Sequence, residues 1–167
     1  YCSSVCCMYA IKEAMIAKEH VHGDLDCVVF NMDMRTFGKD YEKYYNRARY
    51  KDGVQFVKAR IHTVTEVRET GDLIVKYADE TGEMKEEIFS MVVLSVGLQI
   101  PNTSVELAQR LGIELNHYNF TKTSPFSPVE TNQPGIYTCG VFQGPKDIPG
   151  SVTEASAAAC EAGANLV

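Results

Sequence analysis

The chain has 167 residues, of which 45% are hydrophobic and 23% charged, a composition that fits one folded domain or slightly more and excludes a disordered chain. The formal net charge of −6 argues against a nucleic-acid partner, which would favour a basic surface. No apolar run approaches the roughly 18–20 residues of a membrane span. The first residue is Tyr1 rather than Met, so we expect the natural protein to extend upstream.

The N-terminal third predicts two helices separated by a strand. Apolar residues recur at helical spacing from about Ser4 to His20, which indicates a helix there. The short apolar run Cys27–Phe30 is typical of a buried strand. A polar, tyrosine-rich helix is then predicted from about Asp40 to Tyr50.

The hydrophobic period changes after the turn at Asp52-Gly53. Apolar and polar residues alternate, and turns at Thr70-Gly71 and Glu80-Thr81-Gly82 separate the segments, which predicts an antiparallel meander. Its apolar residues are Val54, Phe56, Ile61, Val64, Val67, Leu73, Val75 and Tyr77. The run from Ile88 to Val96 then predicts one further buried strand, which ends at Gly97.

The C-terminal third combines short elements with a long connection. Leu107–Leu111 fits a short helix with Gly112 at its C-cap. Residues 119–135 contain three prolines and indicate an extended connection or a seam between two units. A short strand at Ile136–Thr138, a glycine- and proline-rich loop at Gly140–Gly150 and an alanine-rich helix at Ser151–Asn165 follow. This element order predicts an α/β fold with an antiparallel insertion.

Two segments place glycine directly after a strand, where a backbone can approach a ligand closely. They are Met91–Asn102 and Gly135–Gly140, the second leading into the last helix. Together they resemble the flavin oxidoreductases with two dinucleotide domains, the thioredoxin reductase type. The resemblance implies a Rossmann-type, nucleotide-binding-domain-like unit at residues 1–118. It also implies that residues 119–167 return the chain to an FAD-binding domain. The alternative is a generic strand–loop–helix unit.

The same resemblance implies FAD as a cofactor. The helix start near Ser151 would direct free amides toward the flavin, and Lys146 could stabilise a reduced, anionic flavin. The family usually has an aspartate soon after the second glycine, whereas Val141, Phe142 and Gln143 follow Gly140 here. The expected cofactor-binding residues are Gly97, Gly140, Val141, Lys146, Pro149, Gly150, Ser151 and Val152.

The chain contains six cysteines, three of them within its first seven residues: Cys2, Cys6, Cys7, Cys27, Cys139 and Cys160. This density is too low for a disulfide scaffold, so a reducing cytoplasmic setting with metal or redox chemistry is favoured. The first three lie at a predicted helix start, where amide dipoles favour thiolates. No G-x-G-x-x-G phosphate turn occurs in the chain.

A four-iron (4Fe-4S) cluster needs four ligands, usually cysteines. The fourth could come from upstream of Tyr1 or from Cys27. The alternative is that the cysteines are small buried hydrophobic residues, and this is the interpretation favoured for Cys27, Cys139 and Cys160.

The resemblance becomes specific at the two ends, Tyr1–Ala14 and Gly144–Ser156. Both resemble the A subunit of heterodisulfide reductase and its relatives in sulfate reducers. This implies that Cys2, Cys6 and Cys7 bind a 4Fe-4S cluster beside FAD, with the fourth ligand upstream. It also implies electron transfer to the B and C subunits of heterodisulfide reductase, an electron-donating enzyme as partner, a homo-oligomer of the full subunit and, in some organisms, electron bifurcation.

Three further features of the sequence are weaker indications of function. Asp33 follows a strand where nucleotide domains place a ribose-binding acid, and the nearby Arg35 could favour a phosphate, although the missing glycine turn argues against pyridine nucleotides. A histidine and aspartate group after the first helix is better explained as solvated turn residues than as a metal site. It consists of His20, His22, Asp24 and Asp26. A cofactor-free docking or scaffold module is the rival function.

Overall fold

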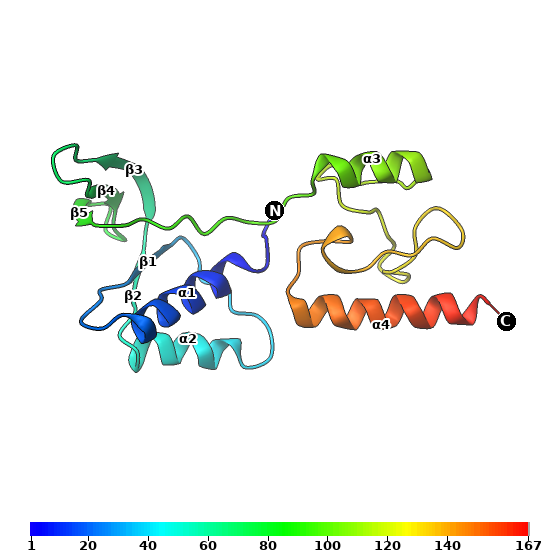
Figure 1. Ribbon diagram of the computed structural model, residues 1–167, viewed down its shortest axis with the longest axis horizontal. Helices are drawn as coiled ribbons and strands as arrows, with labels where there is room; N and C mark the ends of the chain where they lie inside the picture. The colour runs from blue at the N-terminus through cyan, green and yellow to red at the C-terminus, as the bar shows by residue number, and fades with distance from the viewer. Residues whose placement is uncertain (167) are drawn as a thin grey trace. The chain divides into compact units, whose positions relative to one another are not determined.

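The computed structural model describes residues 1–166, and the chain forms two compact units (Figure 1). The sheet unit consists of Cys6–Val96, and the C-terminal unit combines Tyr1–Val5 with the residues from Gly97 onward. The predicted α/β class, with a parallel sheet and an antiparallel meander, is confirmed. The chain passes between these two units after Val5 and again after Val96. The domain boundary proposed between residues 118 and 119 stays a prediction.

The first half of the sheet unit alternates helices with parallel strands: α1 (Cys6–His20), β1 (Val28–Asn31), α2 (Tyr41–Tyr50) and β2 (Gln55–Lys58). Strand β1 pairs in parallel with β2, and α1 contacts both α2 and β1. A buried apolar cluster holds these elements together and consists of Ile11, Met15, Ala48 and Val54.

The helical spacing of Ile11 and Met15 puts both on the buried face of α1. Ile11 is 0% exposed, and full burial of such a side chain contributes about 1.5–3 kcal/mol. The helix begins at Cys6 rather than at the predicted Ser4, because Ser4 has a φ of 64°, which lies in the left-handed region and outside a right-handed helix.

The predicted meander is confirmed as a three-stranded antiparallel sheet of β3 (Arg60–Glu66), β4 (Leu73–Ala78) and β5 (Met84–Phe89), with β4 in the centre. Its expected first segment, with Val54 and Phe56, is wrong, because these residues lie at β2, which pairs in parallel with β1. The turns fall where the sequence predicts them, at Gly71 and Gly82. A second buried cluster forms where the meander packs against Phe30 of β1 and Val57 of β2. Its members are Ala59, Val75 and Tyr77.

The predicted buried strand Ile88–Val96 is wrong for most of its length. Strand β5 ends at Phe89, and residues 91–101 have no regular secondary structure. Val92 packs against the second cluster. Its apolar neighbours are between 67% and 77% exposed: Met91, Val93, Leu94 and Val96. In residues 1–166 no strand pairs with this run.

In the C-terminal unit, helix α3 (Asn102–Leu111) extends further toward its N-terminus than predicted. Gly112 has a φ of 68° and its N–H reaches the carbonyl oxygens of Ala108 and Gln109, which confirms the predicted C-cap. The predicted strand Ile136–Thr138 is reduced to one isolated bridge, between Glu130 and Tyr137.

A short 3-10 turn η1 (Gly140–Phe142) precedes the last helix, α4 (Ile148–Ala164). Helix α4 begins three residues before the predicted Ser151, because the Asp147 carboxylate caps it by accepting the Gly150 N–H at 2.8 Å. Pro149 lies in the first turn, where its missing N–H costs nothing. Within the described residues no helix is long and apolar enough to cross a membrane.

Candidate functional site

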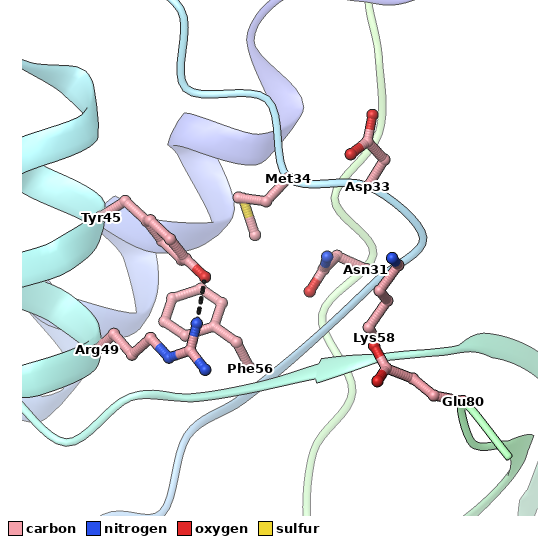
Figure 2. A pocket seen from close by; sticks show the side chains of 8 residues that line it. All are labelled: Asn31, Asp33, Met34, Tyr45, Arg49, Phe56, Lys58 and Glu80. Atoms are coloured by element: carbon pink, nitrogen blue, oxygen red, sulfur yellow. Dashed lines mark hydrogen bonds between the residues drawn. The ribbon is translucent and has the colours of Figure 1, made fainter.

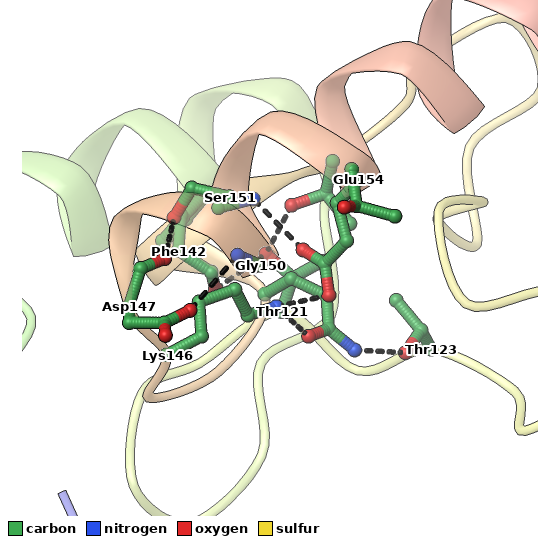
Figure 3. Close-up of polar contacts among 12 residues, drawn as sticks. Thr121, Thr123, Phe142, Lys146, Asp147, Gly150, Ser151 and Glu154 are labelled. Carbon is green, nitrogen blue, oxygen red and sulfur yellow. Dashed lines mark hydrogen bonds and ion pairs between the residues drawn. The ribbon is translucent and has the colours of Figure 1, made fainter. Parts of the chain in front are cut away.

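Several of the predicted cofactor residues lie around one polar network at the start of α4 (Figure 3). The Lys146 ammonium group pairs with the Glu154 carboxylate and also donates to the side-chain oxygen of Gln143. The second Glu154 oxygen accepts the Gly140 N–H at 2.9 Å. The side chains of Lys146 and Glu154 are only 13% and 24% exposed, so water screens their charges less than it screens surface pairs.

This network is anchored to the preceding connection. The Gln143 amide group donates to the Thr123 hydroxyl at 3.1 Å, and the Thr121 N–H donates to the Phe142 carbonyl at 2.9 Å. Gly140 has a φ of 68°, a conformation that favours glycine. The sequence singled out Gly140 and Lys146 but missed Glu154, because a helix residue that reaches back over a loop leaves no local pattern.

The amides at the start of α4 are already used within the protein. Gly150 donates to the Asp147 carboxylate, and the Ser151 N–H donates to the Asp147 carbonyl at 3.0 Å. Of the amides at the helix start near Ser151, those of Gly150 and Ser151 are therefore not free to bind a flavin. Val141 and Val152, by contrast, are exposed. The assignment of these residues to cofactor binding stays a prediction.

The predicted approach of a ligand to Gly97 stays a prediction, and in the structure the neighbour of Gly97 is Ser3 of the same chain. A Cβ atom on Gly97 would lie 2.8 Å from the Ser3 Cβ atom, closer than real Cβ atoms approach. The Ser3 hydroxyl is buried without a hydrogen-bond partner among the described residues, which costs free energy unless a partner is supplied. An orphaned hydroxyl next to Cys2 fits a bound group at this end of the chain.

The predicted metal ligands are divided between the two units. Cys6 and Cys7 open α1 in the sheet unit, whereas Cys2 belongs to the C-terminal unit. The Arg35 N–H donates to the Cys7 sulfur at 3.5 Å, and the Ser4 N–H donates to the Cys2 sulfur at 3.4 Å. Hydrogen bonds to sulfur of this kind tune iron–sulfur centres, so the donor chemistry suits a cluster.

The described residues, 1–166, contain no group of three or more His, Cys, Asp or Glu side chains that could hold a metal ion. Cluster ligation by Cys2, Cys6 and Cys7 therefore stays a prediction. Cys27 packs against the first core cluster, as expected of a small hydrophobic residue. The same expectation is wrong for Cys139 and Cys160, which are exposed.

An open cleft of about 430 Å³ lies in the sheet unit, beyond the ends of β1 and β2 (Figure 2). Its lining residues are Asn31, Asp33, Met34, Tyr45, Arg49, Phe56, Lys58 and Glu80. Two of these are cationic and two anionic. Two of these ionic groups have partners within the protein: Arg49 donates to the Tyr45 hydroxyl at 3.1 Å, and Asp33 pairs with Arg35 at 3.1 Å. The balance of charge selects neither an anionic nor a cationic ligand.

The titratable groups with shifted pKa values lie in the meander. Hydrogen bonds from Lys85 and Thr81 hold the pKa of Asp79 well below its usual range, and the same contact raises the pKa of Lys85. A hydrogen bond to Glu87 raises the pKa of Tyr77. These pairs stabilise strands and a turn of the meander.

The histidine and aspartate group after α1 is exposed, as expected of turn residues; it consists of His20, His22, Asp24 and Asp26.

Comparison with known proteins extends the sequence resemblance. Residues 14–159 match the family model described as pyridine nucleotide-disulphide oxidoreductase. A protein of Archaeoglobus profundus that is named as similar to the heterodisulfide reductase A subunit is 40% identical over 164 residues, which cover 97% of this chain and 23% of that protein. The iron-sulfur A subunit of the CoB–CoM heterodisulfide reductase of Methanocaldococcus jannaschii is 43% identical, with 95% of this chain and 24% of that protein covered.

The A subunit of the H(2)/formate:CoB-CoM heterodisulfide,ferredoxin reductase of Methanococcus maripaludis is also 43% identical, over 95% of this chain and 24% of that protein. The predicted resemblance to the A subunit of heterodisulfide reductase is thus confirmed. The chain spans about a quarter of the length of these relatives. With a family model that matches most of its length, the chain belongs to the pyridine nucleotide-disulphide oxidoreductase family.

Proposed function

We propose that the chain is part of an FAD- and iron–sulfur-dependent oxidoreductase subunit that relays electrons in the manner of the heterodisulfide reductase A subunit. The observation that supports this most directly is identity of 40–43% along 95–97% of the chain with three proteins named after that subunit. Because the chain spans only about a quarter of those proteins, the electron relay is a property proposed for the whole subunit.

In this proposal FAD lies beside the loop between Gly140 and Gly150. The flavin supplies the redox chemistry, and the protein supplies position and electrostatics. Gly140, Val141, Pro149 and Val152 would offer backbone and apolar contact to the cofactor. Lys146 would add positive charge, reduced in effect by its ion pair with Glu154. Gly97, Gly150 and Ser151 would support the surrounding backbone.

The second cofactor of the proposal is a 4Fe-4S cluster with Cys2, Cys6 and Cys7 as three of its ligands. Thiolates are the usual ligands of such clusters, and the sulfur atoms of Cys2 and Cys7 already accept backbone N–H groups. The complete subunit would pass electrons to the B and C subunits, receive them from a donor enzyme, and form a homo-oligomer in a reducing cytoplasm.

Anaerobic reconstitution of the complete subunit with iron and sulfide tests this function. We expect Cys6→Ala to lose about four iron atoms per subunit relative to the wild type, because a four-iron site would lose one of its ligands. Cys160→Ala is the matched control, since that thiol is exposed on α4 and should leave the iron content unchanged.

The outcomes separate the two candidate functions. Equal iron content in Cys6→Ala and the wild type would contradict cluster ligation. A wild-type subunit that takes up neither iron nor FAD would favour the rival, a cofactor-free docking module.

A further inference from the structure

The carboxylate of Glu154 connects two features of the loop before α4. One oxygen pairs with the Lys146 ammonium group, and the other accepts the Gly140 N–H at 2.9 Å. Glu154 lies in the second turn of α4, and its contacts with Gly140 and Lys146 hold the loop against this helix. Removing it would free a lysine charge and a glycine amide together.

The pair with Lys146 has electrostatic weight because it is shielded from solvent. The two side chains are 13% and 24% exposed, and a charge in such a place acts over a longer range than one in water. With Glu154 ionised, Lys146 contributes a cation balanced by an adjacent anion. Without Glu154, its positive charge acts on its surroundings unbalanced.

We propose that Glu154 is a positioning residue that lowers the flavin midpoint potential by balancing the charge of Lys146. This inference rests on the proposed function, in which FAD lies beside this loop. Reduction adds negative charge to the flavin, so an unbalanced cation nearby favours the reduced form and raises the potential. The ion pair removes most of that effect.

The test compares midpoint potentials of the FAD-loaded complete subunit, measured by spectroelectrochemistry. Glu154→Gln should raise the potential, because Gln keeps the shape and an oxygen acceptor but loses the charge. Lys146→Met should lower it, because an unbalanced carboxylate remains. The double variant should return close to the wild type, and it guards against a folding defect because it leaves no unpaired charge.

We expect each single variant to change the ratio of reduced to oxidised flavin at fixed potential by about tenfold, which is about 30 mV for a two-electron couple. Glu161→Gln removes a charge from a later turn of the same helix and should leave the potential unchanged.

The failures are distinguishable. If the wild-type subunit binds FAD and both single variants keep its potential, the role of Glu154 is wrong and the proposed function stands. If both single variants shift the potential in the same direction, charge balance is likewise wrong. If the wild-type subunit binds no FAD, the proposed function fails and this inference fails with it.

Discussion

Position 97 requires glycine because a distant part of the chain packs closely against it. A Cβ atom added to Gly97 would lie 2.8 Å from the Ser3 Cβ atom. We expect Gly97→Ala to lower the free energy of unfolding by about 1–3 kcal/mol, the usual cost of overpacking. Chemical denaturation followed by circular dichroism measures this change.

Two variants control for the effect of adding a methyl group. Ser3→Gly should restore part of the stability in the double variant, because it removes the atom that clashes. Gly163→Ala in α4 has nothing within 4 Å of the added Cβ, so we expect a gain of roughly 0.5–1 kcal/mol from helix propensity. Equal losses in Gly97→Ala and Gly163→Ala would contradict the steric explanation.

The sequence predicts that a ligand approaches Gly97 closely, and it gives no sign that Ser3 packs against this glycine. The rule that glycine after a strand permits contact is local, whereas Ser3 lies 94 positions earlier in the sequence. Glu154 was missed for the same reason, since its partners Gly140 and Lys146 lie across a loop. Contacts between distant residues are decided by packing, which sequence spacing does not encode.

Among the elements, the turn between β4 and β5 is held by Asp79. One of its oxygens accepts the N–H groups of Thr81 and Glu83, at 2.9 and 3.1 Å, and the other pairs with Lys85 at 2.8 Å. These contacts lower the pKa of Asp79 below its ordinary value of 3.8. A group with a depressed folded pKa stabilises the fold above its unfolded pKa, and loses that contribution as the pH falls through its folded pKa.

We therefore expect Asp79→Asn to be less stable than the wild type at neutral pH, with a constant difference above about pH 5. Below the ordinary pKa of 3.8, the difference should shrink, because the unfolded wild-type chain takes up a proton at Asp79 that the folded protein binds only at lower pH. Urea denaturation over a pH series measures it. Glu69→Gln, an exposed change in the other turn of the meander, should show no such trend, and a pH-independent difference for Asp79→Asn would contradict the assignment.

The elements predicted correctly are those with local signals. Turns at Gly71 and Gly82 and the C-cap at Gly112 need positive φ, which glycine provides at low cost. The start of α4 was misplaced although its signal was present, since Asp147 and Pro149 are an N-cap and a first-turn proline. The prediction that the strand continues to Val96 is wrong for a different reason. An apolar run becomes a strand only where another strand pairs with it.

At the scale of the whole molecule, the predicted flavin contacts are concentrated in one part of the chain. Apart from Gly97, they all lie between Gly140 and Val152 in the C-terminal unit, and the chain spans about a quarter of its relatives. Association costs several kcal/mol of lost freedom before any contact contributes. A loop and one helix start offer few contacts against that cost, particularly as the Gly150 and Ser151 amides are already bonded to Asp147.

We therefore expect the isolated 167-residue chain to bind FAD weakly and the complete subunit to bind it tightly. Equilibrium dialysis of both proteins against FAD, with riboflavin as a ligand that lacks the adenine dinucleotide part, measures the difference. The complete subunit should prefer FAD over riboflavin by a large factor, and the isolated chain should show little preference, because the proposed loop would meet only the flavin end. Tight, stoichiometric FAD binding by the isolated chain would mean that the proposed division at residue 118 is wrong.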